Sequence, residues 1–404
     1  MPQDFSLSIL VVDDDAFMLT LVGRALKKLG YTRVVTCNNG REALSCLNPM
    51  DGTPHVILLD LNMPEMDGIE FVRNLVERRY NGSLILMSGE EPRVLQSVQK
   101  LLEAHQLRLL GRLDKPIVAE TLAALLDQHV SSVTRAPRAA KKVYSAQAIK
   151  SAIANNEFIN VYQPKVAVES GKVVGVETLV RWRHPQDGMV FPDQFIGVAE
   201  EGGLIDELTH VVLVGALAQS RAWRRSGLSL RVAVNVSMDN LRALNFVDSV
   251  ASLAADLGVP PQDIVLEVTE SQVLQDTRAV LDVLTRLRLR RFGLSIDDFG
   301  TGHSSLAQLR DIPFDELKVD RSFVHGADTN NTVRAIFEAS LTLARQLGMK
   351  IVAEGVEDRK DWDFLKTSGC DLAQGYFIAK PMPASDLPGW MEQWQAKVIG
   401  GFAV

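Results

Sequence analysis

The chain has 404 residues, 46% of them hydrophobic, and a formal net charge of −7 at pH 7, which predicts two or three domains with sizeable cores. A mildly acidic chain without a long basic run is not expected to bind DNA, and no apolar run approaches the roughly 18 residues of a membrane span. The cysteines Cys37, Cys46 and Cys370 show neither disulfide nor zinc spacing, and the first residues do not resemble a signal peptide, so we expect a cytoplasmic location.

Strand and helix patterns alternate over residues 1–130. Short apolar runs predict strands at 8–12, 33–37, 55–60, 84–89 and 107–114. Segments with helical periodicity follow them at 17–30, 40–48, 68–79, 92–105 and 118–130. Five strand–helix units predict an α/β fold, namely a doubly wound parallel sheet with helices on both faces.

Polar side chains follow the predicted strands of this sheet, at the edge where such folds bind ligands. They are Asp13, Asp14 and Asp15 after the first strand, Asp60 at the third, Ser88 at the fourth and Lys115 after the fifth. Carboxylates with one lysine suit a small hard cation such as Mg²⁺. Helix capping could explain any one of these residues, but it does not explain the set.

The motifs VVDDD, LLDLNMPEMDG, MSG and DKP resemble those of receiver domains in two-component response regulators, over the whole segment. The resemblance implies a sensor histidine kinase as partner and Asp60 as phosphoacceptor. It also implies one Mg²⁺ or Mn²⁺ ion at Asp13 and Asp14, with Ser88 and Lys115 contacting the phosphoryl group. Receivers usually carry an aromatic switch residue three positions before the lysine; this chain has Arg112 there, so the usual coupling to the output is not implied.

Residues 131–144, SSVTRAPRAAKKVY, form the predicted linker between two domains. They include four basic residues and no acidic one. Dispersed charges of this kind are typical of a solvated hinge, and a nucleic-acid-binding arm is the alternative.

The second domain, residues 145–404, repeats a rhythm of strand, turn and helix. Strands are predicted at 158–166, 173–182, 230–237, 264–270, 292–298, 316–320, 350–357 and 372–381, with helices between them such as 205–225, 279–290 and 332–348. Eight strands in roughly 260 residues predict a TIM-like (β/α)₈ barrel.

The ends of these strands carry acids, amides and a single lysine. They are Glu177, Asn235, Glu267, Glu270, Asp297, Asp298, Lys318, Asp320, Glu354 and Gln374. Adjacent carboxylates such as Asp297 and Asp298 repel each other unless a cation lies nearby. Convergence at one barrel mouth would create an all-oxygen site for two Mg²⁺ or Mn²⁺ ions rather than a zinc site.

The motifs ETLVRW, NVS, LEVTE, DDFGTG, LKVD, VAEGVE and QGYFIAKP resemble the EAL-domain family of cyclic di-GMP phosphodiesterases, over nearly the whole domain. The signature tripeptide is Glu177-Thr178-Leu179, with Thr in place of Ala. The resemblance implies metal ligands at Glu177, Asn235, Glu267, Asp297, Asp298 and Glu354, with Asp297 bridging two ions. It implies a catalytic role for Glu177, Lys318 and Glu354, substrate contacts from Gln163, Arg181 and Gln374, and anchoring of the loop 299–305 by Glu270.

Together the two resemblances imply a response regulator that hydrolyses cyclic di-GMP to linear pGpG with two metal ions, modulated by phosphorylation of Asp60. We also expect a homo-oligomer formed through the barrel. The alternatives are a non-catalytic cyclic di-GMP receptor and an interaction protein that titrates phosphoryl groups. Synthesis of the dinucleotide is not predicted because no GGDEF-like run is visible.

Overall fold

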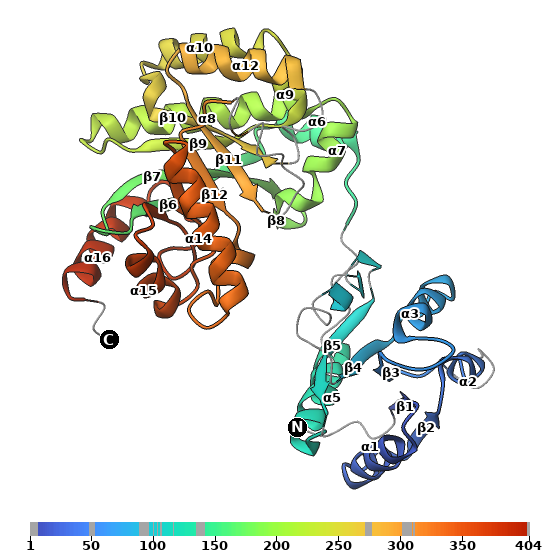
Figure 1. Cartoon of the computed structure of the whole chain (residues 1–404). Coiled ribbons are helices and arrows are strands. Elements are labelled where there is room, and N and C mark those ends of the chain that lie inside the picture. The colour runs from blue at the N-terminus through green and yellow to red at the C-terminus, as the bar shows by residue number, and fades with distance from the viewer. Residues whose placement is uncertain are drawn as a thin grey trace. The chain divides into compact units, whose positions relative to one another are not determined.

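The computed structural model describes residues 7–47, 53–88, 97–99, 101–102, 104–105, 107–115, 117–134, 142–270, 277–300, 309 and 312–401. The chain forms two compact units, Met1–Lys141 and Lys142–Val404, each described by itself (Figure 1). Among the described residues, no helix is both long and apolar enough to cross a membrane. The cytoplasmic location stays a prediction.

The first unit contains a five-stranded parallel sheet. Its strands are β1 (Ser8–Val12), β2 (Arg33–Cys37), β3 (Val56–Asp60), β4 (Ser83–Ser88) and β5 (Arg108–Asp114), in the order β2-β1-β3-β4-β5. The described helices are α1 (Ala16–Lys28), α2 (Gly40–Ser45), α3 (Gly68–Glu77) and α5 (Ala119–Thr134). This confirms the predicted doubly wound fold. The helix predicted at 92–105 lies largely outside the described residues, and α5 extends into the predicted linker.

Alternating residues of the first unit's strands enter two different cores. Ile9 and Val11 of β1 pack with Val22 of α1 and Leu122 of α5. Their neighbours Leu10 and Val12 pack in a second core, with residues of α2 and α3 that include Ala43 and Phe71. Since successive strand residues face opposite sides of a sheet, helices must cover both faces.

The second unit is a closed eight-stranded barrel. Its strands are β6 (Phe158–Ala167), β7 (Val173–His184), β9 (Arg231–Asn235), β10 (Ile264–Thr269), β11 (Gly293–Phe299), β12 (Glu316–Val319), β13 (Lys350–Ala353) and β14 (Leu372–Ala373). Pairing of β6 with both β7 and β14 closes the ring, and β8 (Gly188–Val190) adds a short strand to β7. The predicted barrel is confirmed. One strand, β6, runs antiparallel to both neighbours, because the short segment between β6 and β7 permits a hairpin but no crossover helix.

Helices surround this barrel (Figure 1). They are α6 (Ala146–Ala154), α7 (Ile196–Glu201), α8 (Ile205–Arg225), α9 (Met238–Arg242), α10 (Phe246–Leu257), α12 (Thr277–Leu289), α14 (Asn331–Gln346), α15 (Arg359–Ser368) and α16 (Leu387–Ile399), with the 3₁₀ turns η1 (Pro192–Gln194), η2 (Pro261–Asp263) and η3 (Arg321–Phe323). Several elements are shorter than predicted. The last strand ends at Ala373, and Glu354 follows β13 instead of lying within it.

The barrel strands also alternate, and this alternation decides which residues face the interior. Leu266 of β10, Ile296 of β11 and Leu317 of β12 belong to the core shared with the helices. Their neighbours therefore point the other way, into the barrel. Those neighbours include polar residues on three consecutive strands: Glu267, Asp297 and Lys318.

The three cysteines are free thiols. The structure nevertheless places the Sγ atoms of Cys37 and Cys46 3.5 Å apart, at the end of β2 and just after α2. The sequence spacing alone did not indicate this contact.

Candidate active site

Lys318 lies at the centre of the polar cluster inside the barrel and is 1% exposed. Its Nζ atom lies near four carboxylates: 2.7 Å from Glu354, 2.9 Å from Glu267, 3.1 Å from Asp297 and 3.6 Å from Glu177. The strand ends that carry these residues thus converge on one point. One ammonium group cannot balance four carboxylates, so the cluster has an excess of negative charge.

The protonation behaviour of the cluster reflects this excess. Burial disfavours the charged form of Lys318, but the surrounding carboxylates outweigh burial and raise its pKa well above the usual value. Burial raises the pKa of Glu354 to about 8, with Lys318 opposing the shift and the Asp297 charge adding to it. Burial likewise raises the pKa of Glu267 to about 7. Additional positive charge would therefore stabilise the ionised cluster.

The acids form two overlapping groups in which a carboxylate oxygen from each residue lies within 4.8 Å of the others. The first group contains Glu177, Glu267 and Asp297, and the second contains Asp297, Asp298 and Glu354. Asp297 belongs to both, at the position where the family resemblance implies a bridging ligand. Asp298 has a φ of 56°, an uncommon value for a residue with a side chain, and the pairing of β11 with β12 shifts register there.

Amide side chains hold the carboxylate of Glu177. Gln374 donates to its Oε2 atom at 2.6 Å and Asn235 donates to its Oε1 atom at 2.9 Å. Gln374 also donates to Gln163 at 3.0 Å. The Oε1 atom of Gln374 is buried and has no hydrogen-bond partner among the described residues. A buried oxygen acceptor without a partner is costly and calls for a cation or an ordered water.

These observations show that the residues fit hard divalent cations. All the candidate donors are oxygens, the cluster has excess negative charge, and one acceptor has no partner. Mg²⁺ and Mn²⁺ prefer such donor sets.

A pocket of about 280 Å³ opens above the cluster and is lined by Gln163, Glu177, Asp297, Lys318, Glu354 and Gln374. Arg321, Glu357 and Tyr376 line it too, although the sequence analysis did not select them. They lie a few residues after the ends of β12, β13 and β14. Their position just beyond strand ends was the feature of the sequence from which they could have been predicted. Arg321 pairs with Glu357 at 2.8 Å.

Arg181 lies outside the described lining of this pocket. Its Nη1 atom donates to the carbonyl oxygen of Val180 at 2.8 Å, and its guanidinium lies 5.1 Å from the centre of the Phe191 ring. Its charge nevertheless interacts with Tyr376 and with Glu177 of the cluster, so Arg181 lies near the cluster without lining the pocket.

Glu270 contacts the segment that follows Asp298. Its Oε2 atom accepts a hydrogen bond from the backbone of Gly300 at 2.7 Å. Gly300 has a φ of +96°, which favours glycine, and a Cβ atom there would lie 2.8 Å from the Phe323 ring. Residues 301–308 lie outside the described residues, so the predicted anchoring of the loop 299–305 can be followed only at its start.

A second buried lysine, Lys165, lies inside the barrel and is 4% exposed. The sequence analysis selected only one barrel lysine, the one among the residues at the strand ends. Its Nζ atom lies 2.8 Å from Glu316 and 3.4 Å from Glu267. Glu316 also pairs with Arg231 at 2.6 Å. Burial would raise the pKa of Glu316, but Lys165 and Arg231 outweigh it and lower that pKa to about 2. The missed signal is that Lys165 lies two residues from Gln163, on the same face of one strand.

The first unit contains a third acidic group, made of Asp13, Asp14 and Asp60 at the ends of β1 and β3. The Nζ atom of Lys115 lies 2.7 Å from Asp60 and 2.9 Å from Asp13. Burial raises the pKa of Asp60, and the Lys115 contact opposes that shift. This group too has the oxygen donors that suit Mg²⁺.

The remaining residues selected in the first unit take other positions. Ser88 is the last residue of β4, and its side chain lies outside the described atoms. Asp15 caps α1 by accepting a hydrogen bond from the backbone of Phe17 at 2.8 Å. Arg112 lies 3.7 Å from Asp114 with about half of its side chain exposed.

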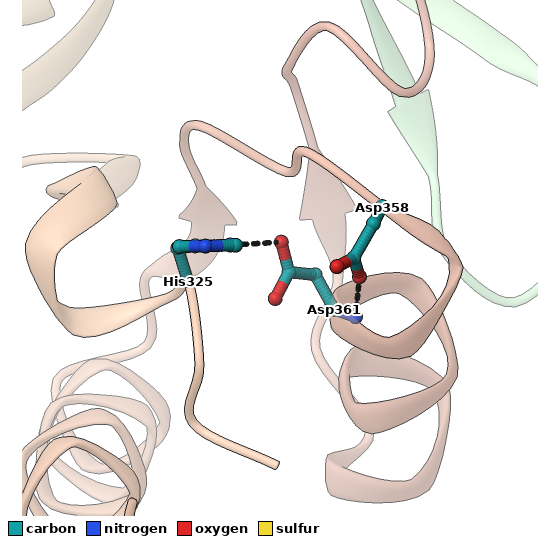
Figure 2. Close-up of side chains that lie close together, drawn as sticks. All are labelled: His325, Asp358 and Asp361. Atoms are coloured by element: carbon teal, nitrogen blue, oxygen red, sulfur yellow. Dashed lines mark hydrogen bonds and ion pairs between the residues drawn. The ribbon is translucent and has the colours of Figure 1, made fainter. Parts of the chain in front are cut away.

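A fourth group contains His325, Asp358 and Asp361 (Figure 2). The Nδ1 atom of His325 lies 3.0 Å from Asp361, while Asp358 caps α15 by accepting from the backbone of Asp361 at 3.0 Å. Asp361 also accepts from the backbone of Glu357 at 2.9 Å and of Gly326 at 3.2 Å. Because these bonds satisfy the carboxylates, we interpret the group as a structural link between η3 and α15. The sequence analysis did not select it, since no histidine has ligand spacing.

Comparison with known proteins adds independent findings. The model of the EAL domain family matches residues 146–381, and that of the response regulator receiver domain matches residues 9–128. Cyclic di-GMP phosphodiesterase RocR of Pseudomonas aeruginosa is 33% identical over 379 residues, which cover 93% of this chain and 96% of that protein.

Two solved structures resemble the barrel. A c-di-GMP complex of the phosphodiesterase PaMucR matches with a TM-score of 0.57 and 40% identity, covering 60% of this chain and 98% of the other. The EAL domain of DcpA from Mycobacterium smegmatis matches with a TM-score of 0.51 and 34% identity, covering 58% and 98%.

Proposed function

The chain belongs to the EAL domain family and joins that domain to a response regulator receiver domain, and from this premise we propose that it hydrolyses cyclic di-GMP to linear pGpG. The observation that carries the proposal is the convergence of four carboxylates on Lys318 beneath an open pocket. A receptor that only binds the dinucleotide has no need of such a cluster.

The metal assignment is part of this proposal. Glu177, Asn235, Glu267 and Asp297 would hold one Mg²⁺ or Mn²⁺ ion, and Asp297, Asp298 and Glu354 a second. When bound, such ions supply a water of lowered pKa and charge stabilisation at the phosphate. The overlap of the two acidic groups at Asp297 supports the assignment.

The chain's own residues orient the reactants. Lys318 keeps the carboxylates in one arrangement and contributes a fixed positive charge beside the phosphate position. Gln374 and Asn235 hold both oxygens of Glu177, which fixes the direction of that ligand. Gln163 and Gln374 line the pocket and are assigned to substrate, and Arg181 is assigned to a phosphate oxygen pair through its fork of donors.

A hydrolysis assay tests the enzyme assignment. Purified chain with Mg²⁺ should convert cyclic di-GMP to pGpG, detected by chromatography. Glu177→Ala should abolish turnover while the circular dichroism spectrum is retained. Glu169→Ala, at an exposed position in a turn, is the matched control and should keep the wild-type rate. Binding of cyclic di-GMP by the wild-type chain without any turnover would favour the receptor instead.

Replacing the cation tests the two-metal part separately. Ca²⁺ is larger than Mg²⁺ and coordinates more loosely, so it should inhibit the reaction. Equal rates in Ca²⁺ and Mg²⁺ would contradict the proposed use of two closely held ions.

We further propose that a sensor kinase phosphorylates Asp60 and that phosphorylation modulates the barrel. Asp60 would act as a carboxylate nucleophile, Asp13 and Asp14 would hold a cation, and Lys115 would neutralise the phosphate, with Ser88 assigned to the same group. The ion pairs from Lys115 to Asp13 and Asp60 support this arrangement.

The regulatory proposal has its own test. A small phosphodonor should change the hydrolysis rate of the wild-type chain and leave Asp60→Asn unchanged. An unchanged wild-type rate despite measured phosphorylation would favour the phosphoryl-titrating role. Sedimentation of the same samples checks the predicted homo-oligomer.

A further inference from the structure

A column of alternating charges runs through the barrel interior to the candidate active site. Arg231 pairs with Glu316 at 2.6 Å, Glu316 with Lys165 at 2.8 Å, Lys165 with Glu267 at 3.4 Å and Glu267 with Lys318 at 2.9 Å. Arg231, at the far end, is one-third exposed, whereas the members between it and the active site are buried.

The strand arrangement explains how Lys165 enters this column. Lys165 lies two residues along β6 from Gln163, so both side chains point to the same side of the strand. Its register partner on β7 is Gly175, which has no side chain to occupy the space beside it. A Cβ atom on Gly175 would lie 2.8 Å from the carbonyl oxygen of Arg231. A buried lysine therefore fits one layer below the pocket.

The carboxylates of Glu267 and Glu316 lie in the layer below the pocket and require a nearby positive charge. Both are register partners of Ser295 on β11, the strand that lies between β10 and β12. Within this layer of the barrel, the short side chain of Ser295 is the one between them. They are 0% and 1% exposed. Two buried carboxylates so placed repel each other, and the Nζ atom of Lys165 contacts both.

We propose that Lys165 is a positioning residue of the active site, which holds the carboxylate of Glu267 in the orientation that binds metal. The inference rests on the proposed function, because it takes Glu267 as a metal ligand. Lys165 contacts Oε1 of Glu267 and Lys318 contacts Oε2, so both oxygens are held. A ligand must be ionised and correctly oriented, and the partners behind ligands supply this.

The test measures Mn²⁺ binding by electron paramagnetic resonance, independently of turnover. All samples carry Asp14→Asn, which weakens the acidic group of the first unit. Lys165→Met keeps the side-chain length and removes the charge, and it should weaken Mn²⁺ binding by about 10- to 100-fold. Lys165→Arg keeps a cation and should recover most of the affinity. Raising the Mn²⁺ concentration should restore the hydrolysis rate of Lys165→Met.

Two further variants separate positioning from folding. Lys165→Met/Glu316→Gln removes both members of the buried pair, so outside the acidic cluster the only partner it deprives is Arg231, which is one-third exposed, and it should still show the weakened Mn²⁺ binding. Arg288→Met breaks an ion pair with Asp315 of 2.7 Å elsewhere in the barrel, and it should keep the wild-type affinity.

Unchanged or tighter Mn²⁺ binding in both Lys165→Met and the double variant would overturn the inference, because Lys165 would then oppose the cation or act in folding alone. Wild-type binding that is insensitive to Glu177→Ala would instead overturn the metal assignment itself. The two failures are therefore distinguishable.

Discussion

At the scale of single residues, the positive charge of Lys318 offsets the repulsion among the four buried carboxylates of the acidic cluster. Its ammonium group is fully buried, and its pKa is raised by the carboxylates around it, so it remains charged over the physiological range. The four carboxylates share this cation, and Glu267 also contacts Lys165. Removing Lys318 would leave uncompensated buried charge, as breaking a buried ion pair does.

Replacing Lys318 should therefore affect both stability and activity. We expect Lys318→Met to lower the unfolding free energy of the metal-free protein by about 3–5 kcal/mol. Hydrolysis should fall by at least about 100-fold, as when other preorganised charge-stabilising groups are removed. Urea unfolding and the chromatographic assay measure the two effects, and a stable, active variant would show that the cluster does not depend on Lys318.

The sequence allowed the acids at the strand ends to be predicted, but not the full cluster. Glu177, Glu267 and Asp297 follow visible apolar alternation, so their direction and level could be inferred. Lys165 and Glu316 also face the barrel interior, but they lie at strand positions that carry no family motif. Their importance depends on which strand lies opposite, and alternation within one strand does not contain that information.

At the scale of elements, the first turn of α15 depends on one capping residue. Asp358 accepts hydrogen bonds from the backbone of Lys360 at 2.8 Å and of Asp361 at 3.0 Å. Figure 2 shows the second of these bonds. We expect Asp358→Ala to lower the unfolding free energy by about 1 kcal/mol, measured by urea denaturation. Asp358→Asn keeps an acceptor and should lose much less; equal losses would rule out capping as the cause.

The stability that the link between η3 and α15 contributes should depend on pH, because the link includes the ionisable side chain of His325. Its hydrogen bond to Asp361 raises the pKa of His325, and the charges of Glu357 and Asp358 add to the shift. A raised pKa contributes stability that is fully present below the unfolded value, about 6.5, and is lost as the pH rises through the folded value.

Comparing His325→Gln with the wild-type chain tests this link. The variant should be less stable than the wild type at pH 5.5, and the difference should shrink at pH 9. Because the histidine side chain is nearly half exposed, the effect should stay below about 1 kcal/mol. His210→Gln, at an exposed position on α8, is the control. A difference that grows with pH would show that the ion pair is not its source.

Most elements were predictable because their hydrophobic periods are strong. The direction of β6 was missed, although a signal existed: the predicted strands at 158–166 and 173–182 are too close for a crossover helix. The extent of β14 was missed for another reason. The run at 372–381 is largely buried without being a strand beyond Ala373, and burial alone does not specify extended pairing.

At the scale of the whole molecule, the two units have separate hydrophobic cores. The cores of the sheet contain residues from Leu7 to Leu126, and those of the barrel contain residues from Tyr144 to Trp394. Units with their own cores are expected to unfold independently.

Calorimetry of the full chain should therefore show two unfolding transitions. Mn²⁺ should raise both midpoints, since each unit has an acidic group suited to a cation. Asp14→Asn should reduce the shift of one transition and Glu177→Ala that of the other. A single transition that both variants affect equally would show that the units unfold together.

The ring of the barrel is closed when β14 pairs with β6, through Leu372 with Ala167 and Ala373 with Val166. Backbone hydrogen bonds between Tyr162 and Met382, at 2.7 and 2.9 Å, add an isolated bridge beside this pairing. The paired strands come from opposite ends of the second unit, so the ring cannot be completed on the ribosome until β14 has emerged. The sheet of the first unit needs no residue beyond α5 and can form much earlier. Synthesis therefore separates the two events in time, and the half-built barrel exposes the unpaired edge of β6 until its last strand arrives.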